Sequence, residues 1–318
     1  MTDLVLVADI GGTNARFALA DLATLELSHL HQTLCISHSS VDAALSEYLS
    51  GLPLKPRTAA LAVAAPVCGE AIDLTNSHWS FRTRELCRST KLEAIHVLND
   101  FQALAMSLPT LAPADLRQIG GLAPEEHATK IVLGPGTGLG VAGLVWSGER
   151  WVPVAGEGGH MSLGARDAEE LALLQALGKG DAHFSAERAI SGPGLAALYR
   201  AVAAARNEPA ADPIDVVARA LAGEAAAGEA LGLFITWLGR FAGNAALAFG
   251  ARGGVYIGGG IAPKITAALA AGSFRAAFEQ KGRMSAYLAP IPVYVILAEF
   301  ATLKGAATAL RASLAAPI

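Results

Sequence analysis

Residues 9–16 form a glycine-rich turn that carries a carboxylate and short hydrogen-bonding side chains. The stretch reads Asp-Ile-Gly-Gly-Thr-Asn-Ala-Arg and lies between two apolar runs, Leu4–Ala8 and Phe17–Ala20. Adjacent glycines lack Cβ atoms, so the backbone turns tightly and its N–H groups approach a bound anion closely. Asp9 supplies a carboxylate where a magnesium shell could sit. The same residues also fit an ordinary hairpin with a Gly-Gly turn, so phosphate binding and a plain turn are both open here.

The same arrangement occurs a second time at residues 134–140. Strand-like Lys130–Leu133 enters a Gly-Pro-Gly-Thr-Gly-Leu-Gly turn, and apolar Val141–Val145 leaves it. A dinucleotide fingerprint would continue into a helix, whereas both turns continue into extended segments. Neither turn has the Gly-Lys-Ser/Thr ending of a Walker loop. Two such turns favour a pair of phosphate-binding hairpins.

Asp100 follows a predicted strand at its carboxyl end, where α/β sheets bind ligands. A carboxylate in this position can act as the general base that takes a proton from a substrate hydroxyl in phosphoryl transfer. Asn and Asp are also favoured helix N-caps, and a helix is predicted to begin at Asn99-Asp100. The two roles can coexist, with one residue for each.

Glu157 and His160 lie three residues apart in the glycine-rich stretch Gly156–His160. A lone histidine is most often a surface residue, but the glycines here let a ligand approach the backbone closely. A carboxylate and an imidazole suit a polyhydroxylated ligand. Glu187 is the next candidate. Glu187 could instead have a purely structural role. In that interpretation Ser185 is the N-cap of a helix, and the helix dipole favours a glutamate such as Glu187 in the first turn.

Gly258, Gly259 and Gly260 follow a predicted strand and precede a predicted helix. They fit either a tight turn or the floor of an adenosine pocket. Both uses need glycine for the same reason, so the sequence leaves this choice open.

The composition is that of a globular protein with substantial cores. The 318 residues are 53% hydrophobic and 16% charged, with a net charge of −4 and a mean hydropathy of +0.41. We expect no membrane span and no signal peptide, because the apolar runs are interrupted and no basic segment precedes the first one. The absence of a basic block disfavours nucleic-acid binding. Cys35, Cys68 and Cys87 show no metal spacing, which favours a cytoplasmic protein.

Predicted strands and helices alternate along the chain, which indicates an α/β fold with a mixed sheet. The strands are the two hairpins at Leu4–Leu19 and residues 130–145, then Ala59–Ala65, Ala94–Leu98, Val255–Ile257 and Val293–Ile296. The helices are Ser40–Leu49, Asn99–Leu108, Asp167–Leu177, Gly194–Ala205, Pro213–Leu221, Ala227–Phe249, Lys264–Ala271 and a C-terminal helix with a stripe from Leu303 to Leu314. Residues 109–126 are predicted to be a connection. The C-terminal helix is expected to return to the first domain.

With these motifs in this order, the chain resembles bacterial glucokinases of the non-ROK type, within the actin-like and hexokinase ATPase superfamily. The resemblance covers nearly the whole chain and includes Asp9–Arg16, Thr75-Asn76-Ser77-His78-Trp79, residues 98–101, Gly134–Gly140, Gly156–His160, Ser185–Gly194 and Gly258–Pro263. It implies two RNase H-like α/β domains with mixed sheets flanking an interdomain cleft. The expected bounds are 1–110 plus 300–318 for the small domain and 111–299 for the large one. Closure of such domains on the sugar would exclude water.

The resemblance also implies roles for individual residues. Transfer of the γ-phosphoryl of ATP to the glucose 6-hydroxyl would use Asp100 as base, with glucose held by Asn99, Asp100, Glu157, His160 and Glu187. ATP would contact Ala8, Asp9, Ile10, Gly11, Gly12, Thr13, Gly136, Thr137, Gly138 and Gly259, and Asp9 would reach Mg²⁺ through water. A homodimer is expected. Met161–Gly164 stands where ROK kinases have a cysteine-rich zinc motif, which argues against structural zinc.

Three alternatives are weaker. A kinase for fructose, mannose or N-acetylmannosamine would have the same motifs, because spacing says nothing about sugar stereochemistry. A sugar-responsive regulator would need a DNA-binding module, yet the first turn starts at residue 9. An actin-type or chaperone-type ATPase would carry an added partner-binding domain, for which few residues follow Val293.

Overall fold

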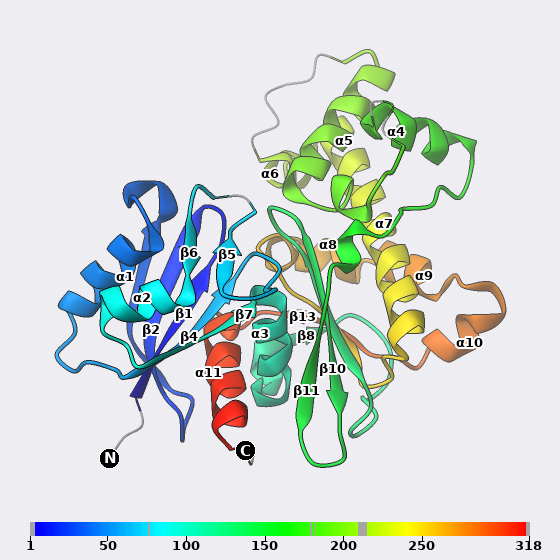
Figure 1. The fold of residues 1–318 in the computed structure, drawn as a ribbon. Coiled ribbons are helices and arrows are strands. Elements are labelled where there is room, and N and C mark those ends of the chain that lie inside the picture. Colours follow the sequence, from blue (N-terminus) through cyan, green and yellow to red (C-terminus); the bar gives the residue numbers. More distant parts are fainter. Residues whose placement is uncertain (1–3, 76, 179, 181, 209–214, 316–318) are drawn as a thin grey trace. The chain divides into compact units, whose positions relative to one another are not determined.

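The computed structural model describes residues 4–75, 77–178, 180, 182–208 and 215–315 (Figure 1). The chain divides into two compact units. The first comprises Met1–Leu111, Trp151–Ala155 and Ala298–Ile318, and the second comprises Ala112–Arg150 and Gly156–Leu297. Asn76 of the predicted Thr75–Trp79 motif and Pro213, the expected start of a helix, lie outside the described residues.

The first unit is built on a five-stranded mixed sheet with the order β3-β2-β1-β4-β7. β1 pairs antiparallel with β2 and parallel with β4, which pairs parallel with β7. Its strands are β1 (Leu4–Ile10), β2 (Asn14–Asp21), β3 (Leu27–Leu34), β4 (Thr58–Val63) and β7 (Ala94–Asn99), with a small ladder of β5 (Ala71–Asp73) and β6 (Ser80–Arg82). Its helices are α1 (Val41–Ser50), α2 (Thr83–Thr90), α3 (Asp100–Ser107) and α11 (Ala301–Leu314).

The central strands β1, β2 and β4 are buried on both faces, which explains why they are almost continuously apolar. Alternate residues of β1 enter different cores: Leu6 packs with Leu45 of α1, whereas Val7 packs with Leu303 of α11. α3 and α11 lie side by side (Figure 1), and Gly305 allows their close approach, because a Cβ there would lie 2.6 Å from the carbonyl carbon of Ala103. The helix that begins at Asp100 is thus fixed by close packing.

The second unit has a six-stranded mixed sheet with the order β11-β10-β9-β12-β13-β8. β9 pairs antiparallel with β10 and parallel with β12, which pairs parallel with β13. The strands are β8 (Leu116–Gln118), β9 (Lys130–Pro135), β10 (Leu139–Trp146), β11 (Trp151–Gly156), β12 (Val255–Ile257) and β13 (Val293–Ile296). The helices are α4 (Ala168–Gly178), α5 (Gly192–Ala205), α6 (Val216–Leu221), α7 (Ala225–Phe249), α8 (Thr266–Ala270), α9 (Ser273–Glu279) and α10 (Ser285–Leu288).

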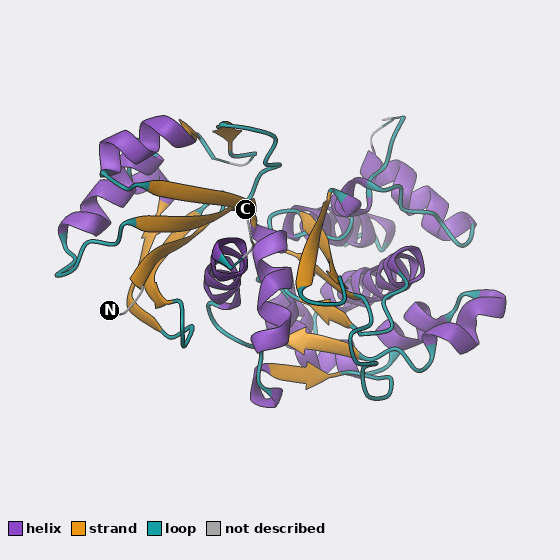
Figure 2. Ribbon diagram, turned by 60° about the horizontal axis from the view of Figure 1, so that its bottom comes forward, coloured by secondary structure: helices purple, strands orange, loops and turns teal. Residues whose placement is uncertain are grey.

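α7 is the central helix of this unit and packs against α5, α6 and α9; the helices and strands are distinguished by colour in Figure 2. Among the described residues it alone is long and apolar enough to cross a membrane, but 67% of the window concerned is buried within the unit. Phe234, Leu238 and Phe241 are part of its main hydrophobic core. The apolar surface of α7 is therefore used for packing.

Most of the predicted elements are confirmed, including both hairpins, the helix expected at Ser40–Leu49, and β12 at its predicted bounds. That helix is α1, and Ser40 is its N-cap. Two predictions were wrong in detail. The connection at 109–126 contains the short strand β8, and the helix expected at 264–271 is a 3-10 turn followed by α8. β3 was missed because most of its residues are exposed at the sheet edge, so it shows no apolar alternation.

Candidate active site

The first glycine turn joins β1 to β2 and is closed by the Gly11 N–H, which donates to the Asn14 carbonyl at 3.0 Å. Thr13 is exposed, and Gly11 and Gly12 are partly exposed. Ala8 and Ile10 belong to β1 and have fully buried side chains. These two predicted residues therefore have no accessible atoms, and the accessible part of the turn is Gly11–Thr13.

Asp9 is the carboxylate of this turn, and its Oδ2 accepts a hydrogen bond from Arg16 Nη1 at 3.2 Å. The Asp9 side chain is 18% exposed. Burial raises its pKa, and the neighbouring Arg16 charge partly opposes that rise. Arg16 is held in turn by Gln32, whose amide donates to Asn14. The carboxylate thus has a fixed orientation.

The described residues contain no cluster of three or more side chains suited to a metal. Mg²⁺ bound with a nucleotide needs only one or two protein carboxylates, because phosphates and water supply its other ligands. Asp9 fits this requirement as a single, oriented carboxylate beside a turn of accessible backbone.

Cys35 holds the first turn through two hydrogen bonds, a role that the sequence did not indicate. Its N–H donates to the Thr13 carbonyl at 2.8 Å, and its thiol donates to the Gly11 carbonyl with Sγ at 3.4 Å. Burial raises the pKa of this thiol, which favours the protonated form that can donate. No local signal marks the role, because Cys35 lies 24 residues from Gly11.

Asn99 caps α3, as the sequence allowed. Its Oδ1 accepts the N–H groups of Phe101 and Gln102 at 2.9 and 3.3 Å, and its Nδ2 donates to the Ala65 carbonyl at 3.3 Å. Asp100 Oδ1 shares the Phe101 N–H at 3.0 Å. The capping function therefore rests mainly on Asn99, and Asp100, which is partly exposed, starts the helix beside it.

The second glycine turn joins β9 to β10 and adjoins two other segments of the second unit. Gly136 donates to the Gly138 carbonyl, and its own carbonyl accepts the Gly192 N–H at the start of α5, both at 2.8 Å. Gly259 has a φ of +80°, and a Cβ there would lie 2.5 Å from the Pro135 carbonyl oxygen. The predicted phosphate turn and the predicted adenosine turn are thus packed backbone to backbone.

Glu157 directly precedes the 3-10 turn Gly158–His160, and His160 is its last residue; both are exposed. This segment is bonded to the one that carries Glu187, because the Ala186 N–H donates to the Met161 carbonyl at 2.8 Å. His183 reinforces it, with Nε2 2.8 Å from the His160 carbonyl oxygen. The structure therefore brings these three predicted sugar-binding residues into one part of the second unit.

Glu187 also reaches the second glycine turn, because its Oε2 accepts the Leu139 N–H at 2.9 Å. The alternative in which Ser185 caps a helix that has Glu187 in its first turn is wrong in detail. Residues 186–188 form a single 3-10 turn, Ser185 makes no side-chain cap bond, and the long helix begins later with Ser191 as its cap. Glu187 is thus oriented by a strand residue 48 positions away.

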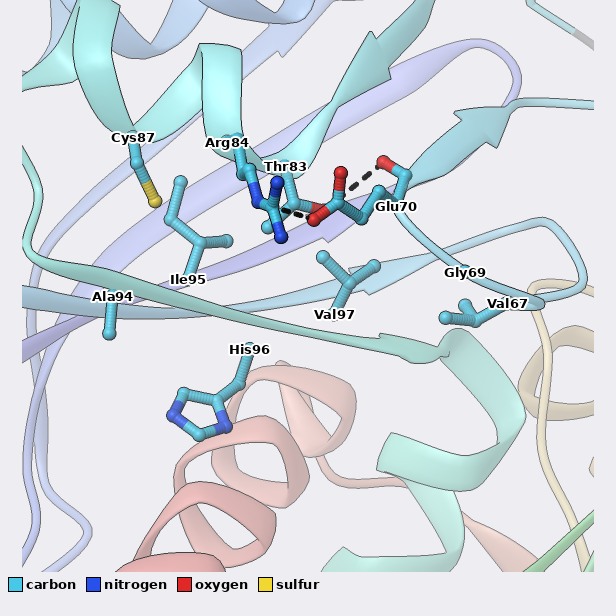
Figure 3. Close-up of a pocket in the computed structure, with 10 residues that line it drawn as sticks. All are labelled: Val67, Gly69, Glu70, Thr83, Arg84, Cys87, Ala94, Ile95, His96 and Val97. Carbon is cyan, nitrogen blue, oxygen red and sulfur yellow. Dashed lines mark hydrogen bonds and ion pairs between the residues drawn. The ribbon is translucent and has the colours of Figure 1, made fainter.

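A separate cavity of about 530 Å³ lies in the first unit, beside β7 and α2 (Figure 3). The close-up shows the Glu70–Arg84 ion pair, with Nε and Oε1 2.6 Å apart, near Val97. None of the predicted site residues lines this cavity.

Asp100 and the first turn belong to the first unit, whereas the second turn, Glu157, His160 and Glu187 belong to the second.

The family model and the most similar relatives identify the same family. The chain is 46% identical over 316 residues to a glucokinase from Aromatoleum aromaticum, covering 98% of this chain and 95% of the relative. It is 39% identical to a glucokinase of known structure from an Antarctic psychrotroph, with a TM-score of 0.84 and coverage of 98% and 100%. A ROK family glucokinase from Streptomyces griseus, solved with glucose and AMPPNP, shares the fold at 20% identity, with a TM-score of 0.68 and coverage of 96% and 98%. The glucokinase family model matches residues 6–313, so the chain belongs to the glucokinase family.

Proposed function

We propose that Asp100 is the general base of the reaction that this chain catalyses. As a glucokinase, the chain transfers the γ-phosphoryl group of ATP to the 6-hydroxyl of glucose, giving glucose 6-phosphate and ADP. Asp100 takes the hydroxyl proton as the oxygen attacks in line, and its carboxylate first aligns that oxygen. Its place at the end of β7, next to an N-cap supplied by Asn99, supports this role.

One observation carries the assignment of the remaining residues. Glu187 accepts the N–H of Leu139, the residue directly after the Gly136–Gly138 segment. A carboxylate suited to sugar hydroxyls therefore adjoins a turn suited to phosphate, as a phosphotransferase to a sugar requires. Glu157 and His160, on the segment bonded next to Glu187, complete the sugar contacts in this proposal together with Asn99.

The nucleotide is held in this proposal by accessible backbone of both turns and by the turn at Gly259. N–H groups aimed at the phosphates stabilise the charge that develops during transfer. Bound Mg²⁺ would neutralise phosphate charge, and Asp9 is the residue that would hold it through water. The Arg16 bond keeps the Asp9 carboxylate oriented for that contact.

The finer architecture is also proposed. In each unit a hairpin strand pairs parallel with a later strand. The first sheet has its strands in the order third, second, first, fourth and fifth, and the second sheet has the same order once β8 at its edge is left out. This repeated order supports two RNase H-like domains of the actin-like superfamily, with bounds near 1–110 plus 300–318 and 111–299. The interdomain cleft, the non-ROK subgroup, the homodimer and the cytoplasmic location remain predictions.

The direct test is ATP turnover with and without sugar. We expect ADP release in a coupled assay to depend strictly on glucose and on Mg²⁺, and glucose to be preferred in a panel with fructose, mannose and N-acetylmannosamine. Comparable ADP release without any sugar would contradict the kinase assignment. A higher kcat/KM for another hexose would favour the alternative acceptor.

A further inference from the structure

We propose that Gly138, a residue of the nucleotide turn, determines the affinity for the sugar. Its missing Cβ leaves the space in which the Glu187 carboxylate lies. The inference rests on the proposed function of Glu187 as a glucose ligand. Gly138 is thus a positioning residue, which acts on the sugar through Glu187.

The contacts around position 138 support this role. A Cβ on Gly138 would lie inside van der Waals contact of Glu187 Oε2 and 3.1 Å from Glu187 Cδ. Both atoms belong to the carboxylate that accepts the Leu139 N–H at 2.9 Å. The three atoms nearest to the missing methyl group are all from the Glu187 side chain. An alanine at this position would therefore displace the carboxylate.

Other glycines of the same turn would bring a Cβ against different atoms, or against none. At Gly134 a Cβ would lie 2.5 Å from the Gly258 carbonyl carbon, so the packing of two backbones requires glycine. At Gly136 a Cβ would meet no atom within 4 Å. Gly136 and Gly138 thus lie two residues apart in one turn, but only Gly138 touches the proposed sugar ligand.

The consequence should be confined to the site. A glutamate side chain can rotate away from a new methyl group, so the fold has an inexpensive way to accommodate alanine. The rotation breaks the charge-assisted bond to the Leu139 N–H and removes the carboxylate from its fixed position. We expect glucose affinity to fall on the order of 10- to 100-fold with little change in stability.

The test compares Gly138→Ala with Gly136→Ala. Glucose binding is measured by isothermal titration calorimetry without nucleotide, and Tm is measured for each variant. We expect Gly138→Ala to weaken glucose binding at least about tenfold while Tm stays near that of the unmodified chain. Gly136→Ala should keep the nucleotide-free glucose Kd. Unchanged glucose binding in Gly138→Ala, or equal weakening in both variants, would overturn the proposal.

A double-mutant cycle with Glu187→Ala tests separately whether Glu187 binds the sugar and whether Gly138 acts through Glu187. The cycle remains informative if Gly138→Ala lowers Tm. If Gly138 acts through Glu187, adding Gly138→Ala to Glu187→Ala should weaken glucose binding no further. Additive effects would contradict the coupling while leaving Glu187 as a sugar ligand. Unchanged glucose binding in Glu187→Ala alone would instead contradict the proposed function of Glu187, and the coupling with it.

Discussion

Gln102 Oε1 accepts the backbone N–H of Asn99 at 3.1 Å, and Asn99 Oδ1 accepts the Gln102 N–H at 3.3 Å. This reciprocal capping box closes the N-terminus of α3 without depending on the carboxylate between the two residues. Asp100 can therefore be changed while the helix start keeps its cap. Because Asn99 and Gln102 form the cap, a substitution of Asp100 tests its role as the proposed base without removing the capping box.

Asp100→Asn is expected to lower kcat by about 10²–10⁴-fold, the range that a positioned general base contributes. The amide keeps the size of the side chain but has a far weaker ability to accept a proton. Steady-state kinetics with saturating glucose and ATP would measure the loss, and Tm should be nearly unchanged. Asp73→Asn, an exposed carboxylate on β5 of the same unit, is the control. Near-normal turnover in Asp100→Asn would exclude Asp100 as the base.

Cys35→Ala is expected to raise the KM for ATP about fivefold, because it removes the thiol donor to the Gly11 carbonyl, a bond of about 1 kcal/mol. The backbone bond from Cys35 to Thr13 remains, so the turn should loosen without unfolding. The KM for glucose should stay the same. Cys87→Ala, at a cysteine outside the turn, is the control. An equal effect on both KM values would point to a general structural defect.

Gly305→Ala is expected to destabilise the first unit by about 1–3 kcal/mol or more, because the new methyl group would press α11 away from the Ala103 carbonyl. Gly232→Ala in α7 is the matched control, since a Cβ there would meet no atom within 4 Å. That control should be neutral or gain about 0.5–1 kcal/mol from its helix propensity. Urea unfolding of both variants measures the difference. Equal stabilities would argue against close packing of α3 on α11.

Glu170→Gln is expected to lower the free energy of unfolding by roughly 3 kcal/mol at pH 7. Both carboxylate oxygens of Glu170 accept from Arg240 at 2.7 Å, and these bonds lower the pKa of Glu170 from 4.5 to about 2. Because the folded-state pKa lies below the unfolded value, the stabilisation is complete above pH 4.5. It is lost as the pH falls through about 2.

Urea titrations at pH 7, 5 and 3 would check this linkage. The stability gap between the unmodified chain and Glu170→Gln should narrow once the pH falls below about 4.5. The exposed Arg57–Glu93 pair offers the control, because Glu93→Gln should change stability little at any of these pH values. A gap that is constant from pH 7 to pH 3 would contradict the lowered pKa.

Elements with strong local patterns were predictable from the sequence. The hairpins around residues 9–16 and 134–140 combine apolar runs with glycine turns, and the structure has both. α2 was missed because only Leu86 of this helix is buried, so its apolar stripe is minimal. Apolar periodicity in the sequence indicates an element that is buried on one face. Elements at the surface bury few residues, so they show little apolar periodicity.

The residue types of the proposed site are visible in the sequence, whereas the contacts among those residues are not. Glycine turns, a carboxylate after a strand and a glutamate near a histidine are visible in the sequence because phosphate and sugar chemistry need those groups. That Cys35 supports Gly11 across 24 positions follows from the pairing of β2 with β3, an exposed strand without a local signal.

The sequence by itself determined two glycine turns, a carboxylate after a strand and a glutamate near a histidine, and the order of these motifs matches the glucokinase family. Only the tertiary structure decided how the groups of each unit depend on one another. Glu187 meets the Leu139 N–H 48 residues away, and its carboxylate fills the space left by Gly138. Such contacts are set by how loops pack around the end of a strand, and neither residue's neighbours in the chain carry that information.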